Sequence, residues 1–153
     1  MIDLVSAMPI RIFILAMTLL FVGCKPSGLT TTRSKSSDFK TIAERTKFLN
    51  EYVSFRRTYE TLDFDIMYQN NNGGMVPGPS DWDVRLVATV PESELQAWIP
   101  AGVSSAPTAD TQWMKTVPTT LDLSGVNEWY VDGTRVVGVD RTKRIIVYRV
   151  FSM

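Results

Sequence analysis

Two segments in the middle of the chain alternate between apolar and polar residues, and this pattern constrains the fold more than any other feature. In residues 62–68 the even positions are apolar and the odd positions are mostly polar, and residues 82–90 repeat the pattern. A period of two residues is typical of a strand with one buried face. We therefore expect the two segments to pair as an antiparallel hairpin across the loop of residues 70–80.

The same alternation predicts the register of this hairpin. If Tyr68 lies opposite Trp82, the apolar faces coincide, and Asp65 lies opposite Arg85 on the solvent-exposed face. A slip of two residues also keeps the faces together and would place Asp63 opposite Arg85 instead.

Other segments carry signals of short helices and further strands. Apolar residues at three- and four-residue steps, with capping-box spacing near the start, predict an amphipathic helix over residues 39–55. Shorter helices are expected at residues 91–99 and 113–117, and strands at residues 128–131, 134–139 and 144–151. The last two strands are apolar on both faces, so we expect both faces to be covered by this chain or by a partner. We predict a single α+β domain over residues 39–153, with an N-terminal helix and short middle helices packed on an antiparallel sheet of about five strands.

The first part of the chain has the organisation of an export signal. Residues 12–22 form an apolar run of 11 residues, preceded by Arg11 and followed by Gly23 and Cys24. A helix of that length rises about 16 Å, roughly half the thickness of a bilayer core. The run is therefore expected to be the apolar region of a signal peptide over residues 1–23. Because Asp3 is unusual before such a run, we expect translation to start at Met8.

Phe21, Val22, Gly23 and Cys24 together resemble the lipobox of bacterial lipoproteins, with Phe21 where that family usually has Leu. The resemblance implies cleavage before Cys24 and attachment of lipid to that cysteine. Because Lys25 and not Asp follows the cysteine, it also implies an outer-membrane lipoprotein on the inner leaflet, facing the periplasm. Two or three acyl chains give a durable membrane anchor.

Residues 24–38 are rich in Ser, Thr and Lys and poor in apolar residues. Such a composition cannot bury enough surface to order itself. We therefore expect this lipidated segment to be a flexible tether that lets the folded domain move away from the bilayer.

The composition excludes many kinds of active site. The chain has no His, so it cannot form a Ser-His-Asp triad, a Cys-His pair or an imidazole metal site. Its 16 basic residues balance its 16 acidic residues, so the chain has no net positive charge. Because we also expect the protein to be exported, we expect no nucleic-acid partner. We expect no cofactor and no metal.

Carboxylates remain the main candidates for chemistry. If the hairpin forms, Asp63, Asp65, Asp81 and Asp83 could lie within reach of one another. Such a cluster could bind a hard cation such as Ca²⁺ or hydrolyse a glycosidic bond. Neither pattern is complete, and Arg85 offers a simpler partner, so we expect ion-paired or solvated aspartates.

The loop of residues 70–80 is the candidate binding loop. It is longer than a hairpin needs, and Met75 and Val76 would place apolar side chains on its exposed tip. The candidate binding residues are Asn72, Met75, Val76, Pro77 and, just after the loop, Trp82. A plain connection is the favoured alternative. Residues 76–83 also resemble, weakly, a set of uncharacterised enterobacterial lipoproteins, and no function comes with that resemblance.

Two further groups of residues have a structural and a functional interpretation. The four tryptophans, at positions 82, 98, 113 and 129, are expected in the core, with stacking on a glycan as the alternative. The basic residues near the C-terminus are expected to keep a hairpin soluble, with an acidic protein or an anionic envelope polymer as a possible partner; they are Arg135, Arg141, Lys143, Arg144 and Arg149.

We expect a lipid-anchored cell-envelope lipoprotein whose periplasm-facing domain is a non-catalytic binding or accessory module, serving toxin immunity or envelope assembly. Its expected partners are the membrane, through lipid on Cys24, and an envelope or periplasmic protein. The alternatives are a carboxylate-dependent hydrolase of envelope glycans and a purely structural envelope lipoprotein.

Overall fold

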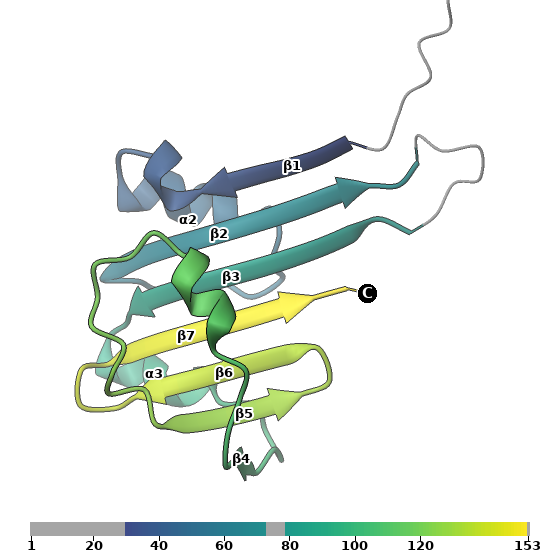
Figure 1. Cartoon of the computed structure of the whole chain (residues 1–153). Coiled ribbons are helices and arrows are strands. Elements are labelled where there is room, and N and C mark those ends of the chain that lie inside the picture. Colours follow the sequence, from purple (N-terminus) through teal and green to yellow (C-terminus); the bar gives the residue numbers. More distant parts are fainter. Residues whose placement is uncertain (1–29, 73–78, 153) are drawn as a thin grey trace, which may run out of the picture.

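A computed structural model describes residues 30–72 and 79–152, which form one antiparallel sheet with helices packed on it (Figure 1). The α+β class is as predicted, but the sheet has seven strands instead of about five, in the order β1-β2-β3-β7-β6-β5-β4. The strands are β1 (Thr30–Lys35), β2 (Thr61–Asn70), β3 (Asp81–Thr89), β4 (Ser105–Ala106), β5 (Glu128–Asp132), β6 (Arg135–Asp140) and β7 (Ile145–Phe151). The helices are α2 (Ile42–Leu49), α3 (Glu92–Trp98) and the 3-10 turns η1 (Ser36–Asp38) and η2 (Gln112–Thr116).

The predicted register of the central hairpin is confirmed. Tyr68 lies opposite Trp82, and Asp65 lies opposite Arg85, so the two-residue slip does not occur. The prediction that Asp65 faces solvent is wrong, because only 2% of this residue is exposed.

The predicted tether is wrong for residues 30–38, which belong to the folded domain. Residues 30–35 pair with β2 along their whole length as the edge strand β1, and Ser36 in η1 is buried. Threonine fits a pleated surface well, and a polar edge strand needs only one neighbour to satisfy its backbone. A composition typical of a linker is therefore also compatible with an edge strand.

The N-terminal helix is shorter than predicted. Thr41 and Glu44 form the expected capping box, but α2 ends at Leu49, and Val53 is buried from a turn that follows it. Phe39 lies before the helix in extended backbone and still contacts Phe48. The three- and four-residue spacing of apolar residues extends beyond both ends of α2, because residues on either side of the helix also pack against the core. The predicted helices at residues 91–99 and 113–117 are confirmed as α3 and η2.

The sheet separates two cores, as Figure 1 shows with α2 and α3 behind it and η2 in front. The larger core lies under α2 and α3 and includes Phe64, Leu86 and Tyr148. The smaller core lies under the segment that carries η2 and includes Trp113, Trp129 and Val147. Strands β6 and β7 are covered on both faces by this chain, as their sequences predicted. None of the helices within the described ranges is long and apolar enough to cross a membrane.

One end of the sheet gathers several chain segments. Thr30 at the start of β1 pairs with Asn70 at the end of β2, and Phe151 at the end of β7 pairs with Asp83 near the start of β3. The start of β1, the end of β2, the start of β3 and the end of β7 therefore lie at the same end of the sheet, at the right of Figure 1. We call this the β2–β3 end of the sheet.

Gly138 in β6 tests the packing of the smaller core. A Cβ atom at this position would lie 2.5 Å from a Val147 methyl, 2.6 Å from the Trp129 ring and 2.8 Å from a Val126 methyl. We expect Gly138→Ala to lower the free energy of unfolding by about 1–3 kcal/mol, because a filled core must shift to admit a methyl group. Urea unfolding measures the change. Thr134→Ala, at an exposed turn position, is the control, and equal stability of the two variants would contradict this packing.

Candidate functional site

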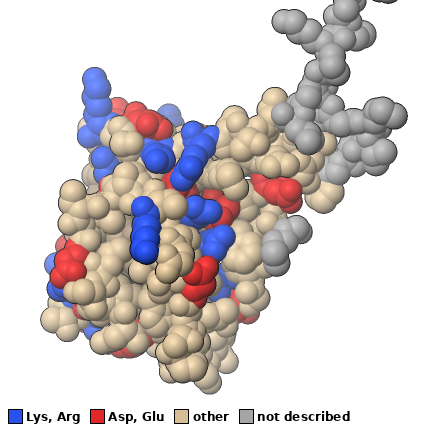
Figure 2. All heavy atoms as spheres, in the orientation of Figure 1, with Lys and Arg blue, Asp and Glu red and all other residues tan. Residues whose placement is uncertain are grey.

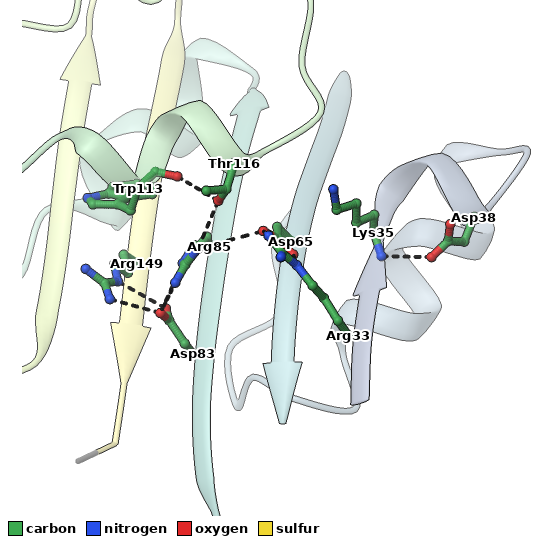
Figure 3. Close-up of polar contacts among 9 residues, drawn as sticks. All are labelled: Arg33, Lys35, Asp38, Asp65, Asp83, Arg85, Trp113, Thr116 and Arg149. Atoms are coloured by element: carbon green, nitrogen blue, oxygen red, sulfur yellow. Dashed lines mark hydrogen bonds and ion pairs between the residues drawn. The ribbon is translucent and has the colours of Figure 1, made fainter. Parts of the chain in front are cut away.

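Two of the predicted carboxylates lie in a row of alternating charges across four strands (Figure 3). Arg33 on β1 donates from Nε to Asp65 Oδ1 on β2 at 2.7 Å, and its Nη2 binds the other oxygen. Arg85 on β3 lies between the two acids, with Nη1 at 3.8 Å from Asp65 Oδ2. We call Arg33, Asp65, Arg85, Asp83 and Arg149 the charged row.

Asp83 accepts hydrogen bonds from two arginines. Arg149 on β7 donates from Nε to Oδ1 at 3.0 Å and from Nη2 to Oδ2 at 2.9 Å, and Arg85 Nε donates to Oδ2 at 3.0 Å. Paired donors of this kind match the planar carboxylate and hold it in one orientation. Both oxygens of Asp83 are therefore engaged.

The segment above the sheet partly covers the charged row. Arg85 Nη1 donates to Thr116 Oγ1 at 2.9 Å, and that hydroxyl donates to the carbonyl of Trp113 at 2.8 Å. Asp65 and Asp83 are 2% and 6% exposed. Figure 2 shows basic and acidic side chains intermingled on this face. The row joins the sheet to η2 and leaves little of either carboxylate in contact with water.

The arginines lower the pKa of both buried aspartates. Burial raises the pKa of Asp65, but hydrogen bonds and charge from Arg33, with the charge of Arg85, outweigh burial and bring it below its ordinary value. Burial also raises the pKa of Asp83, and hydrogen bonds from Arg149 and Arg85 outweigh it in the same way. Both groups are therefore ionised at neutral pH.

The other two predicted carboxylates have separate partners. Asp63 accepts from Arg45 Nη1 at 2.8 Å and from Ser36 Oγ at 3.2 Å. Asp81 accepts from Asn71 Nδ2 at 3.0 Å. Across residues 30–72 and 79–152, no three Asp, Glu, Cys or His side chains are placed to hold a metal ion. The four aspartates share a strand face, but arginines and an asparagine divide them among different partners.

Arg33 tests whether residues 30–35 stabilise the domain. Its removal takes the paired guanidinium donors away from the buried carboxylate of Asp65, and leaves the Thr116 hydroxyl and the longer Arg85 contact. We expect Arg33→Ala to lower the free energy of unfolding by about 2 kcal/mol, within the range for an under-satisfied buried charge. Thermal or urea unfolding measures it. Thr31→Ala, exposed on the same strand, should change it by less than about 0.5 kcal/mol; an equally small effect of Arg33→Ala would refute the role.

The lowered pKa of Asp83 predicts that the stability contributed by the charged row depends on pH. A carboxylate with a lowered pKa in the folded state stabilises the fold above roughly pH 4 and loses this contribution as pH falls through the folded pKa. We expect Asp83→Asn to cost about 3 kcal/mol at pH 7, because it leaves two guanidinium groups without their shared anion. Below pH 4 the variant should lose stability less steeply than the wild type. Urea unfolding from pH 7 to pH 2, with exposed Asp110→Asn as control, checks both points; an unchanged pH profile would contradict them.

The candidate loop is described only at its edges. Met75, Val76 and Pro77 lie outside the described residues, as does Cys24. Asn72 is exposed, and Trp82 is half-buried against the larger core, opposite Tyr68. Trp82 is thus separated from the charged row, because it lies on the opposite face of the sheet.

Trp82 lines a cavity of 460 Å³ on the helical face. The cavity lies between the turn after α2, the end of α3, the starts of β3 and β6 and the second half of β7. Its aromatic lining consists of Tyr52, Phe55, Trp82, Trp98 and Tyr148. A volume of this size is typical of sites for small molecules or single side chains. We call it the aromatic cavity.

The aromatic walls are held by contacts among themselves. Phe55 lies edge-on to Trp98 and to Tyr148, with ring centroids 5.1 and 5.4 Å apart. Trp98 and Tyr148 also meet edge-on at 5.7 Å. Edge-to-face pairs fix ring orientation. The cavity floor is therefore formed by three aromatic rings that contact one another from three separate parts of the chain.

Two charged residues line the aromatic cavity in the part of the chain that the structure describes, and both are arginines. Arg57 donates from Nη2 to the Ala97 carbonyl at 2.6 Å, and its guanidinium lies 5.8 Å from the centre of the Trp98 ring. Arg135, at the start of β6, contacts Asp132 at 3.5 Å and is about half exposed. Burial raises the pKa of Tyr148, although the charge of Arg135 opposes this, so the phenol remains protonated at neutral pH. The lining offers apolar contact and hydrogen-bond donors to a negative group.

Sequence patterns gave only part of this site. Trp82 belonged to the candidate loop and Arg135 to the C-terminal basic residues. No sequence motif connected these two residues with Phe55, Arg57 or Tyr148, which lie in other segments of the chain. An unusual density of aromatic residues between positions 48 and 59 was the one signal that could have directed attention there.

Comparison of the chain with protein-family models, with curated proteins and with solved structures gives no match to any of them.

Proposed function

We propose that this protein is a lipid-anchored lipoprotein of the bacterial cell envelope, and that its folded domain is a non-catalytic binding module. The observation that carries the binding function is the aromatic cavity with its two arginines. The leader and lipobox residues, ending at Cys24, support the anchor. We further propose that the protein sits on the periplasmic side of the outer membrane and binds an envelope or periplasmic protein.

The state of the carboxylates favours binding over glycan hydrolysis. A glycosidase needs one carboxylic acid that keeps its proton near neutral pH and a second carboxylate free to act on the sugar or on water. Asp65 and Asp83 have lowered pKa values and are held by arginines, and Asp63 is held by Arg45. These aspartates stabilise the fold through the same contacts that would hinder such chemistry.

The start of β1 determines how the anchored domain would be oriented. Only six residue steps separate Cys24 from Thr30, and an extended chain covers at most about 3.6 Å per step, or roughly 20 Å in total. An anchored domain would therefore remain close to the lipid, with the β2–β3 end of the sheet nearest to it. This replaces the expectation of a head that moves freely on a long tether.

Such an orientation would place the aromatic cavity close to the bilayer. Trp82, Arg135 and Val150 line the cavity and belong to the strand ends at the β2–β3 end. A lipid anchor raises the local concentration of the module near envelope partners without any chemistry of its own. Toxin neutralisation and support of envelope assembly would both use a module of this kind.

A cavity-filling substitution tests this function. Ser54 is exposed at the cavity wall, so Ser54→Trp should fill the cavity without removing core contacts. We expect the variant to lose about 2 kcal/mol or more of partner binding, roughly a thirty-fold loss in affinity. The measurement is capture of partners from envelopes by the tagged, mature protein, with quantitative mass spectrometry. The same spectra report the mass of the Cys24 peptide, which should carry acyl chains.

Ser93→Trp is the matched control, because Ser93 is exposed on α3 and does not line the cavity. It should capture the same partners as the wild type. An unmodified Cys24 thiol would contradict the anchor, and equal capture by Ser54→Trp and wild type would contradict the binding site. Absence of any specific partner in all samples would favour a purely structural lipoprotein.

A further inference from the structure

We infer that the aromatic cavity binds a single carboxylate carried on an apolar chain or ring. This inference rests on the proposed function, because it assigns a ligand to the proposed binding site. Its support comes from the charge of the lining, the state of each arginine and the apolar walls.

The lining has positive charge without compensating acids of its own. Arg57 and Arg135 are its charged residues, and none of the described residues that line it is acidic. A guanidinium presents paired N–H groups that match a carboxylate or a phosphate. A negative group would therefore be favoured over a neutral or positive one.

The two arginines are not equally available. Arg57 already donates to the Ala97 carbonyl and lies 3.9 Å from a Glu94 oxygen, so part of its charge is compensated. Among residues 30–72 and 79–152, the ion-pair partner of Arg135 is Asp132, in a 3.5 Å pair between two half-exposed side chains. Pairs of this kind contribute little, so a ligand can displace Asp132 at small cost. One available guanidinium suits a singly charged carboxylate better than a doubly charged phosphate.

The remaining walls favour an apolar group attached to that carboxylate. Phe55, Trp98 and Tyr148 form the edge-on floor, and Val150 lies beside them. Displacing water from these surfaces stabilises an apolar chain or ring by roughly 25 cal/mol for each Å² buried. Arg135 at the rim and the aromatic floor together would select a molecule with an anionic end and an apolar body.

Two sources supply this chemistry: the C-terminal apolar residue of a peptide, and a fatty acyl anion. The first is represented by N-acetyl-phenylalanine, with its neutral amide as the uncharged counterpart. The second is represented by octanoate, with octanol as the uncharged counterpart. Each pair differs mainly in charge, so the comparison isolates the role of the arginines.

The experiment measures binding of these four labelled probes to the mature lipidated protein in nanodiscs by equilibrium dialysis, after subtraction of binding to protein-free nanodiscs. In at least one pair, the carboxylate should bind about ten-fold more tightly than its neutral counterpart, as expected for one charge-assisted hydrogen-bonding group. The pair that shows the difference identifies the source.

Arg135→Gln should remove most of this ten-fold preference and leave the fold intact, since its side chain is half exposed. Arg141→Gln is the matched control, because Arg141 pairs with Glu128 and does not line the cavity. Equal binding of charged and neutral probes, no binding of any probe, or an unchanged preference in Arg135→Gln would overturn the inference.

Failure of this inference can be told apart from failure of the proposed function. If Ser54→Trp loses the envelope partner while no carboxylate probe binds, the cavity is a binding site for another chemistry. If Ser54→Trp retains every partner, the proposed function itself fails, whatever the probes show.

Discussion

The burial of two aspartates under a layer of chain is the constraint on which the rest of this structure depends. A carboxylate removed from water needs positive partners and hydrogen bonds of good geometry. Asp65 and Asp83 obtain them from arginines on β1, β3 and β7, so the two acids tie four neighbouring strands together. Arg85 then extends the network to Thr116 in η2. This arrangement makes residues 30–35 part of the domain and fixes the segment that covers the front of the sheet.

The ion pairs that bury these aspartates also give them a structural role, so the proposed binding site lies elsewhere on the sheet. The acids that could have done chemistry are used to hold the sheet together, and their pKa values fall as a result. The opposite face carries a cavity that combines aromatic walls with Arg135, a half-exposed arginine whose partner among the described residues is the half-exposed Asp132. The proposed binding site is therefore on the face that the charged row does not occupy, toward the end of the sheet where the lipid anchor would begin.

Local patterns predicted the parts of the fold that depend on near neighbours. The alternation in residues 62–68 and 82–90 predicted the hairpin and excluded a one-residue shift, which would turn every apolar side chain outward. It left a two-residue slip open, and only the structure shows that Asp65 and not Asp63 lies opposite Arg85. β1 was missed because a row of Thr, Ser and Lys resembles a linker until a partner strand is known. The burial of Asp65 was missed for a similar reason, since the cover comes from η2, about fifty positions later in the chain. The aromatic cavity combines residues from positions 52 to 150, and no single segment contains its pattern.

The most direct test of the account is site-specific photo-crosslinking in intact cells. A benzophenone amino acid would be placed at position 54, on the wall of the aromatic cavity, or at position 81, where it replaces one of the four predicted carboxylates at the start of β3. If the cavity is the binding site, the lipidated protein crosslinks to a defined envelope component from position 54 and not from position 81. Crosslinking from position 81 with none from position 54 would place binding on the charged face and contradict the account.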